Sequence, residues 1–478
     1  MKKIQHPLSV PPAGLALVSL SLSMVLASLG SSVASVALPT LMQAFGAPFG
    51  AAQWVVLAYL LATTTLIVSV GRLGDIISRR QVLLAGLALF AVASLLCGAA
   101  PTLPLLIAAR ALQGLSAAIL MTLSLALASD IAPRDSVGQA VGLLGTASAV
   151  GTALGPSLGG ALIAGSGWRA IFLVNVPLAL VALILAYRWL PADCRSAGTK
   201  TPGLDRLGTL MLALALGTYA LATTIGRGHF GALNLALLAT AITGLALFLV
   251  TEARAAAPIM PLHLFRDPAL RGGLALSAIV STVMMATLVV GPFYLSRALG
   301  LDPASTGLVL SVGPAVVALS GLPAGRLVDR LGAQRMTMPG LATMLGGAAL
   351  LAALPARAGI PGYVAGIVLT TLGYALFQTA NTTAVMQGVQ QDQRGVIAGL
   401  LSLSRNLGLI TGTSVLGAVF ALAAGASELA SAPPEAIANG MRTTFTAAAA
   451  LLLVALGIAA LHRGTVTHTA ARVAIVKP

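Results

Sequence analysis

Apolar stretches long enough to cross a lipid bilayer follow one another along almost the whole chain, separated by short charged breaks. Hydrophobic residues make up 58% of the 478 residues, and charged residues only 8%. A helix needs about 20 mostly apolar residues to cross the hydrocarbon layer of a membrane. This pattern excludes a soluble protein of this size and predicts an all-α membrane protein.

Fourteen membrane spans are predicted at this length. They cover residues 13–38, 51–71, 81–99, 103–129, 138–164, 170–190, 207–226, 231–251, 272–296, 304–325, 336–354, 361–387, 395–424 and 443–461. With the N-terminus inside, the inner segments carry 20 lysines and arginines and the outer loops carry five. Because positive residues concentrate on the cytoplasmic side, this bias together with an even number of spans predicts that both termini are cytoplasmic.

Only two arginines, Arg110 and Arg405, lie well inside an apolar stretch, and the twelve acidic residues lie in the breaks or at their edges. A charge inside a bilayer costs at least about 2.5 kcal/mol and is kept where it faces a cavity or a partner. The sequence therefore predicts a positively charged interior in which no carboxylate is buried.

The composition also argues against several classes of partner. The formal charge is +15, but the basic residues are distributed over many loops without a stripe of interleaved aromatic residues, so no nucleic acid is expected. The two cysteines and five histidines do not stand at metal-ligand spacing, so no metal site is expected. No Gly-x4-Gly-Lys-Ser/Thr motif is present, so we expect no cofactor and an ion gradient as the energy source.

The chain repeats itself. The segment 71–75 reads Gly-Arg-Leu-Gly-Asp, and the segment 325–329 reads Gly-Arg-Leu-Val-Asp. Four glycines recur at an offset of 257 residues: Gly142, Gly151, Gly155 and Gly160 match Gly399, Gly408, Gly412 and Gly417. We interpret residues 1–190 and 268–478 as two six-helix halves, with two accessory spans within residues 191–267. Duplicated halves with a midplane binding site between them are typical of secondary transporters.

A short basic turn follows the second span and contains Gly71, Arg72, Asp75, Arg79 and Arg80. Asp75 can pair with one of these arginines or face the positive N-terminus of a helix in the other half. Either contact would hold one conformation. The alternative is that the turn only places charge for membrane topology. The second copy, which ends in Asp329, favours the conformational interpretation.

Arg110 and Gln113 are three residues apart in the fourth span and therefore share one helix face. A guanidinium stays protonated, so it needs hydrogen bonds, water or an anionic ligand. A snorkelling arginine is the alternative, because the outer end of the span is close. Polar and small neighbours favour a packed interior.

Further candidates for contact with a substrate are Gln378, Asn381, Arg405 and Asn406 in the twelfth and thirteenth spans. Hydrogen bonding to a neighbouring helix is the equally weighted alternative for such residues in lipid. The pair Met284 and Met285 offers an adaptable surface, but we interpret it as packing filler.

The fifth span carries a stripe of small residues, Gly151, Gly155 and Gly159, interrupted by Pro156. Small residues let two helices approach closely, and the proline predicts a kink. Together with the turn at 71–80 and the Arg110–Gln113 pair, this stripe resembles the motifs of the fourteen-spanner drug:proton antiporter branch of the major facilitator superfamily. The stripe resembles the antiporter motif that is associated with exporters. The resemblance extends over nearly the whole chain.

The resemblance implies a major facilitator fold and a multi-pass location in the cytoplasmic (inner) membrane. It implies a multidrug efflux antiporter, rather than an enzyme, that contributes to antibiotic resistance, is driven by protons and acts as a monomer on small organic molecules. It adds Tyr59, Ser31 and Ser32 to the candidate substrate or coupling residues. The first-span signature of the branch departs here, because Gly30 replaces its aspartate.

The absence of that aspartate leaves a second interpretation open. The chain is then a dedicated exporter of an anionic or neutral metabolite with unusual or absent proton coupling. A membrane enzyme or sensor is a third class, but no catalytic cluster or sizeable extramembrane domain supports it.

Overall fold

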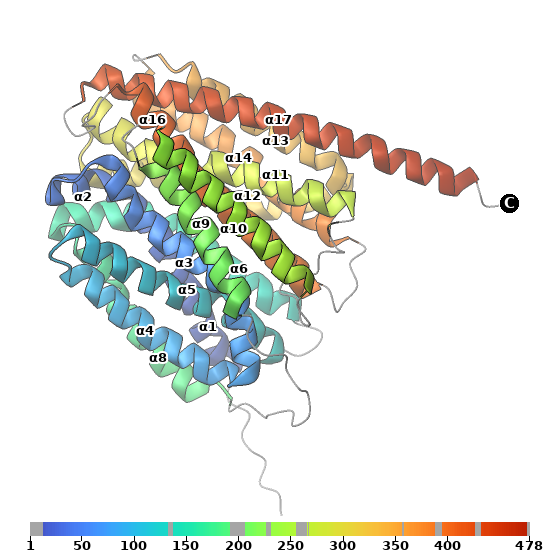
Figure 1. Cartoon of the computed structure of the whole chain (residues 1–478), viewed down its shortest axis with the longest axis horizontal. Coiled ribbons are helices and arrows are strands. Elements are labelled where there is room, and N and C mark those ends of the chain that lie inside the picture. The colour runs from blue at the N-terminus through green and yellow to red at the C-terminus, as the bar shows by residue number, and fades with distance from the viewer. Residues whose placement is uncertain are drawn as a thin grey trace, which may run out of the picture.

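The computed structural model describes residues 13–131, 137–191, 206–225, 231–254, 265, 267–355, 358–387, 394–425 and 432–475. The elements in these ranges are helices (Figure 1). They are α1 (Ala13–Val36), α2 (Leu38–Phe45), α3 (Phe49–Ile76), α4 (Arg79–Ala99), α5 (Leu103–Ile131), α6 (Val137–Ser166), α7 (Ala170–Leu173), α8 (Asn175–Trp189), α9 (Arg206–Thr224), α10 (Ala232–Arg254), α11 (Pro268–Phe293), η3 (Tyr294–Ala298), α12 (Pro303–Leu331), α13 (Ala333–Ala352), α14 (Gly359–Met386), α15 (Arg394–Thr411), η5 (Gly412–Leu416), α16 (Gly417–Ala423) and α17 (Pro434–Ile475).

Each of the fourteen predicted ranges contains a helix. Twelve helices in the described part of the chain are long and apolar enough to cross a membrane. Helix α9 contributes only a shorter apolar segment, Gly208–Thr224, and α13 is not among the twelve. The thirteenth predicted span is one of the twelve and contains the π-helical turn η5 between α15 and α16. The structure thus shows an all-α membrane protein, and the number fourteen stays a prediction.

Polar side chains begin several helices at the ends of the bundle. The Asp302 carboxylate accepts hydrogen bonds from the backbone N–H groups of Ala304 and Ser305 at 3.0 and 3.2 Å, which caps α12. The hydrogen bonds from Ser305 hold the pKa of this carboxyl below its ordinary value. Asp267 caps α11 in the same way through the N–H of Ala269. These caps place carboxylates at helix ends.

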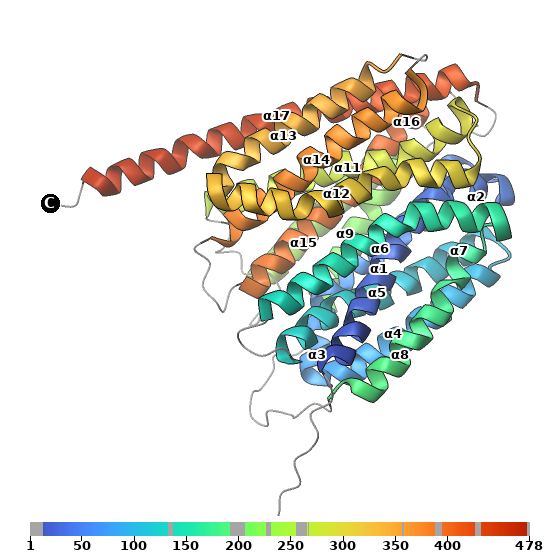
Figure 2. The same cartoon turned by 180° about the vertical axis from the view of Figure 1, so that it is seen from behind.

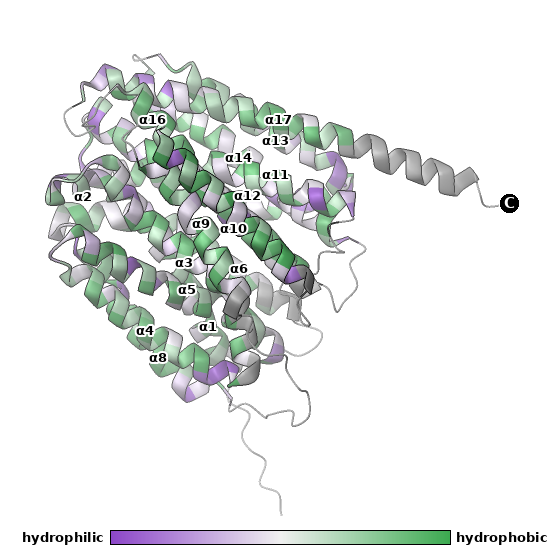
Figure 3. Ribbon diagram, in the orientation of Figure 1, coloured by the Kyte–Doolittle hydropathy of each residue, from purple (hydrophilic) through white to green (hydrophobic). Residues whose placement is uncertain are grey.

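The helices form two groups that lie side by side (Figures 1 and 2). Helices α1, α3, α4, α5, α6 and α8 pack together, and α11 to α17 pack together in the second group. Helices α9 and α10 pack against each other, and α9 also contacts α3 and η5. Figure 3 shows that apolar residues predominate along most of the helices, as expected of segments that cross a membrane.

The buried charges differ from the prediction at one position. Arg110 is fully buried, as expected for an arginine inside a span. Glu252 is also buried, with 1% of its surface exposed, so the prediction that no carboxylate is buried is wrong. The reason is its place in the last turn of α10. It follows Phe248 by one helical turn, on a face that packs against Leu212 and Leu216 of α9.

Candidate functional site

A cavity of about 340 Å³ lies between the two groups of helices. Helices α1, α3, α5 and α6 line it from one group, and α11, α12, α14 and α15 line it from the other. Its wall is rich in hydroxyl groups, which come from Ser28, Ser31, Ser32, Ser148, Ser281, Thr63, Thr152, Thr287, Thr371, Tyr59, Tyr363 and Tyr374. Among the lining residues only Arg405 carries a full charge, and none is an acid.

Five of the residues predicted from the sequence meet in this wall: Ser31, Ser32, Tyr59, Arg405 and Asn406. They come from α1, α3 and α15, which are far apart in the sequence. Both serines donate hydrogen bonds to the carbonyl oxygen of Ser28, at 2.8 and 3.2 Å. Tyr59 donates to the carbonyl oxygen of Ala27 at 2.5 Å, so its ring is held against the wall.

The methionine pair also lines the cavity. Met284 and Met285 of α11 both line the cavity, and Met285 is at the same time part of the buried core against which Met284 packs, so packing filler describes only part of their place. The sequence does not reveal this, because packing of α11 against several helices decides which of its faces meets the cavity. Flexible thioether side chains make such a wall adaptable to ligands of different shape.

Arg110 does not line the cavity but lies behind its wall. Its Nε donates to the carbonyl oxygen of Val55 at 2.8 Å, and its Nη1 donates to Gln113 Oε1 at 2.6 Å. Its Cζ lies 4.3 Å from the centre of the Tyr59 ring and 5.8 Å from the centre of the Phe172 ring. Tyr59 therefore lies between Arg110 and the cavity, because its ring contacts the guanidinium and also lines the wall.

Gln113 continues this network into α4. Its Nε2 donates to Ser94 Oγ at 2.8 Å, and Ser94 in turn donates to the carbonyl oxygen of Phe90. Arg110 and Gln113 therefore join α3, α4 and α5 within one group of helices. Two nitrogens of the buried guanidinium donate hydrogen bonds and two aromatic rings lie against it, while its Nη2 has no hydrogen-bond partner among the described residues.

The two remaining candidates in α14 also lie outside the cavity wall. Asn381 Nδ2 donates to the carbonyl oxygen of Gly273 at 3.0 Å and so joins α14 to α11. Gln378 is half-buried, and its Oε1 has no hydrogen-bond partner among the described residues. Asn381 thus has the helix-bonding role that the sequence left open.

The two groups of helices touch closely at one end of the cavity. A Cβ atom added to Gly160 of α6 would lie 2.9 Å from the Cα of Gly307 in α12 and would overlap the carbonyl oxygen of Pro303. Figure 2 shows α6 and α12 next to each other. No side chain fits between the two backbones at this crossing.

Aromatic rings and one hydrogen bond close the same end. Phe49 of α3 lies 5.2 Å from Phe293 and 6.0 Å from Phe420, measured between ring centres. Gln53 Nε2, also on α3, donates to the carbonyl oxygen of Thr413 in η5 at 2.7 Å. We call the Gly160–Gly307 crossing, these rings and this hydrogen bond the closed end.

The other end of α6 is free of such contact. A Cβ atom added to Gly142 or Gly145 would meet no heavy atom within 4 Å. On α12, Gly321 and Gly325 are equally free. The cavity thus lies between two helix groups that touch at one end and are separate along α6 and α12 at the other.

The sequence profile of the Major Facilitator Superfamily matches residues 20–413 and, in a second match, residues 275–473. The chain belongs to the Major Facilitator Superfamily. Multidrug resistance protein Stp of Mycobacterium tuberculosis is 33% identical over 85% of this chain and 76% of its own length. Riboflavin transporter RibZ of Clostridioides difficile is 27% identical over 85% of this chain and 88% of its own length.

A solved structure shares the fold. The inward-facing, unoccupied structure of a bacterial homologue of the human lysosomal transporter Spinster gives a TM-score of 0.69 at 17% identity, over 95% of this chain and 97% of that chain. The protein is therefore a multi-pass transporter of the inner membrane and not an enzyme. Transporters of this superfamily bind small-molecule substrates within the membrane.

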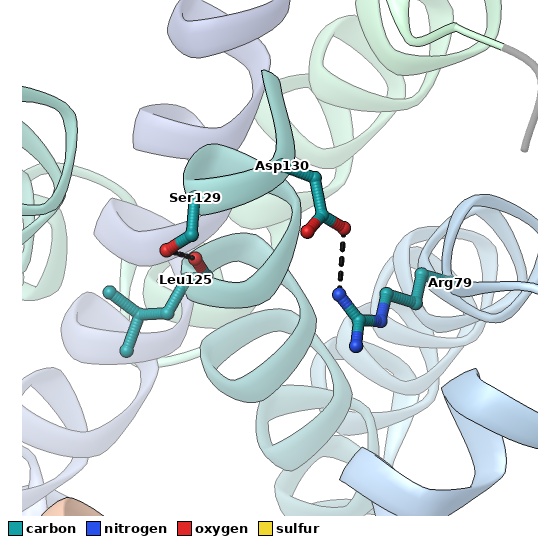
Figure 4. A network of polar contacts seen from close by, with 4 residues as sticks. All are labelled: Arg79, Leu125, Ser129 and Asp130. Atoms are coloured by element: carbon teal, nitrogen blue, oxygen red, sulfur yellow. Dashed lines mark hydrogen bonds and ion pairs between the residues drawn. The ribbon is translucent and has the colours of Figure 1, made fainter. Parts of the chain in front are cut away.

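The basic turn of this facilitator protein is described in part. Arg79 Nη1 forms an ion pair with Asp130 Oδ2 of α5 at 2.7 Å, as Figure 4 shows. Arg80 donates to the carbonyl oxygen of Tyr187 in α8 at 2.6 Å. The side chains of Arg72 and Asp75 are not among those that the structure describes, and neither are the surroundings of Gly71, so the predicted contacts of Asp75 stay predictions. In the second copy of the turn, Asp329 is exposed.

The glycine stripe of α6 faces α1. A Cβ atom on Gly151 would lie 3.0 Å from the Cα of Val25, and one on Gly155 would lie 2.7 Å from the Cβ of Ser32. Gly159 faces Val33 of α1 at 2.9 Å. Helix α6 contains Pro156 and runs without interruption from Val137 to Ser166.

Several residues of the cavity wall were missed in the sequence. Tyr363 and Tyr374 of α14 line the wall together with Ile367 and Thr371. These four residues are spaced by four, four and three, so they form one stripe along the helix. That spacing is a usable signal, but it identifies the cavity face only once another helix of the wall is known.

Proposed function

We propose that this facilitator exports drugs or other toxic organic compounds from the cytoplasm by alternating access. Residues 1–190 and 268–478 would rock against each other about the cavity, and the pair of helices within 191–267 would be accessory. The observation that carries this proposal is a cavity lined from both halves, whose helices α6 and α12 touch closely at one end and are separate at the other. A site between two repeated halves is what alternating access requires. Similarity to a multidrug resistance protein supports export as the direction.

The orientation that we propose places both termini in the cytoplasm and counts fourteen spans. The excess of lysine and arginine in the inner segments supports it. The closed end, with Phe49 and Gly160, then faces the outside, and the end with Arg79 and Asp130 faces the cytoplasm. The structure would accordingly correspond to a state that receives substrate from inside. Since one chain lines the whole cavity, we propose that a monomer is the transporting unit.

We further propose the proton gradient as the energy source, without a bound cofactor. Membership of the superfamily and the resemblance to drug:proton antiporters support this part. Gly30 stands where the branch has an acid, and no lining residue of the cavity is an acid. A proton carried by this protein therefore has to use a group away from the wall, such as Asp130 or Glu252.

Transport into inverted membrane vesicles tests the proposal. Vesicles energised to an acidic interior should accumulate a fluorescent drug from a panel of anionic, neutral and cationic compounds. A protonophore should abolish the accumulation. Vesicles from cells that do not contain the protein serve as the control without transport. Accumulation that is no higher than in these control vesicles for every compound would contradict drug export.

Two observations favour a second function, the export of a single metabolite. The cavity wall contains one arginine and no acid, and a riboflavin transporter is among the relatives. A dedicated exporter of an anionic or neutral metabolite fits both. Saturable transport of a single compound in the vesicle panel, insensitive to a protonophore, would favour this function over drug:proton antiport.

A further inference from the structure

The cavity wall contains a position at which the two halves of the repeat differ in charge. Arg405 follows Ser148 by 257 residues, the same offset that relates Gly151 to Gly408 and Gly155 to Gly412. The matching glycines pack in the same way. Gly151 faces Ser28 of α1, and Gly408 faces Ser281 of α11. Arg405 and Ser148 are therefore equivalent positions in equivalent helix pairs.

The hydroxyl of Ser148, in the first half, has a hydrogen-bond partner within the protein. Ser28 Oγ and Ser148 Oγ form a hydrogen bond of 2.6 Å across α1 and α6. The equivalent pair in the second half is Ser281 and Arg405, and both line the cavity. Ser281 Oγ is buried without a hydrogen-bond partner in the described part of the protein. Among the same residues, none forms a hydrogen bond or ion pair with the Arg405 guanidinium.

Packing alone does not explain an arginine at this position, because a serine fills the equivalent one. Burial against protein partners does not explain it either, in contrast to Arg110, which has Val55 and Gln113. A guanidinium offers five N–H donors and keeps its proton at any physiological pH. Those donors face a cavity wall that contains no carboxylate.

The charges around the cavity also favour an anionic ligand. The Arg110 guanidinium lies directly behind the wall, 4.3 Å from the centre of the Tyr59 ring. Exposed acids such as Asp130 and Asp302 lie at helix ends, and the buried Glu252 lies in α10, outside the wall. Charges interact more strongly in a low-dielectric interior than in water, so two arginines make the cavity attractive to anions.

The rest of the wall suits an aromatic body. Tyr363 is fully buried in the wall, and its hydroxyl has no partner among the described residues. Tyr59 and Tyr374 add two more rings, and Met284 and Met285 add flexible thioethers. Such walls hold planar, apolar groups.

We propose that Arg405, with Asn406 and Ser281 beside it, is the anion-binding subsite of the cavity and takes the carboxylate or sulfonate of an aromatic organic substrate. Two parallel N–H···O bonds from the guanidinium fit either oxyanion. Asn406 supplies an amide, and Ser281 supplies a hydroxyl. Ser28, at the equivalent position of the first half, uses its hydroxyl in the hydrogen bond with Ser148. This inference rests on the proposed transport function and names its substrate class.

Equilibrium binding tests the subsite without any transport. The protein, purified in an uncharged detergent, is titrated in a calorimeter with three probes of one shape: naphthalene-2-sulfonate, naphthalene-2-sulfonamide and 2-naphthyl-trimethylammonium. We expect the sulfonate to bind at least about tenfold more tightly than the ammonium. Arg405→Ser, which introduces the residue of the twin position, should weaken sulfonate binding about tenfold or more and leave sulfonamide binding within about twofold.

Matched variants separate the subsite from a general charge effect. Arg297→Ser removes one positive charge from a residue outside the wall and should leave all three affinities unchanged. Arg405→Lys keeps the charge without the planar fork and should recover only part of the sulfonate affinity. Arg405→Gln replaces Arg405→Ser if the latter does not elute as a folded protein in gel filtration.

Three results would overturn the subsite: no measurable sulfonate binding, ammonium binding as tight as sulfonate binding, or sulfonate binding that survives Arg405→Ser. None of these depends on a gradient or on export. Drug efflux in vesicles combined with tight ammonium binding would therefore refute the subsite and leave the proposed function standing. Tight sulfonate binding without any vesicle transport would do the reverse.

Discussion

Gly160→Ala should shift the balance between the two conformations of the transporter. The added Cβ would lie 2.9 Å from the Cα of Gly307 and would overlap the carbonyl oxygen of Pro303. Both obstacles are backbone, which cannot rotate away as a side chain can. Since the crossing joins the two halves, the least costly relief is to separate them at the closed end.

The size of the shift follows from the cost of over-packing. An extra methyl group in a well-packed contact costs about 1–3 kcal/mol. The contact exists only while the closed end is closed, so this cost falls on that state and not on its opposite. A difference of 1–3 kcal/mol changes the ratio of the two states about 5- to 150-fold.

Distances between spin labels measure the shift. Labels on Gln43→Cys of α2 and Glu435→Cys of α17, both exposed positions, report on the two halves near the closed end. Cys97 and Cys194 are first replaced by alanine. We expect a longer distance to gain population in Gly160→Ala, with slower transport in vesicles because the inward-open state becomes rare.

Gly142→Ala is the matched control. It places the same methyl group on the same helix, where no heavy atom lies within 4 Å. Its distance distribution and transport should equal those of the parent protein. An unchanged distribution in Gly160→Ala would show that the halves absorb the methyl group without separating, which would refute the reasoning.

Three further changes have outcomes that the structure specifies. Gly155→Leu drives a large side chain into Ser32 and should abolish vesicle export while membrane insertion, measured by immunoblot, stays normal; normal efflux would mean that α6 and α1 separate easily. Asp130→Asn breaks the ion pair with Arg79, whose side chains are 53% (Asp130) and 34% (Arg79) exposed, so the free energy of unfolding should change by less than about 1 kcal/mol. Export by this variant should fall because the pair holds one conformation; unchanged export would show that the pair does not. Gly30→Asp brings a carboxylate beside Tyr59 and should raise efflux of cationic relative to anionic drugs; an unchanged ratio would count against a charge-selective cavity.

The positions of the helices were predictable from the sequence, since apolar length alone determines which segments can cross a membrane. Interruptions within spans were not. The π-helical turns at Tyr294–Ala298 and Gly412–Leu416 were not part of the prediction. Helix α13 shows that a predicted span can be a helix of lower apolarity. It stands at a predicted span although its sequence is less apolar than that of the twelve.

The candidate site was predictable as a set of polar residues but not as a geometry. Arg110 and Arg405 look alike in the sequence, as single arginines in apolar helices. They differ because Arg110 meets Val55 of α3 and Gln113, whereas Arg405 meets the cavity. Which face of a helix turns to a neighbour is decided by packing between segments distant in sequence. For the same reason the sequence did not show that Met284 lines the cavity.

Helix α9 is fastened to both halves at once. Trp54 Nε1 of α3 donates to Thr224 Oγ1 at 3.1 Å, and the Tyr219 hydroxyl bonds Thr411 Oγ1 of α15 at 3.1 Å. If the halves rock apart there, α9 cannot keep both bonds, and surrounding lipid offers no replacement. Breaking one of these hydrogen bonds then adds to the activation free energy of the conformational change in each transport cycle. Changing Thr224 or Thr411 would tune how fast the transporter turns over, while every side chain that touches the substrate stays the same.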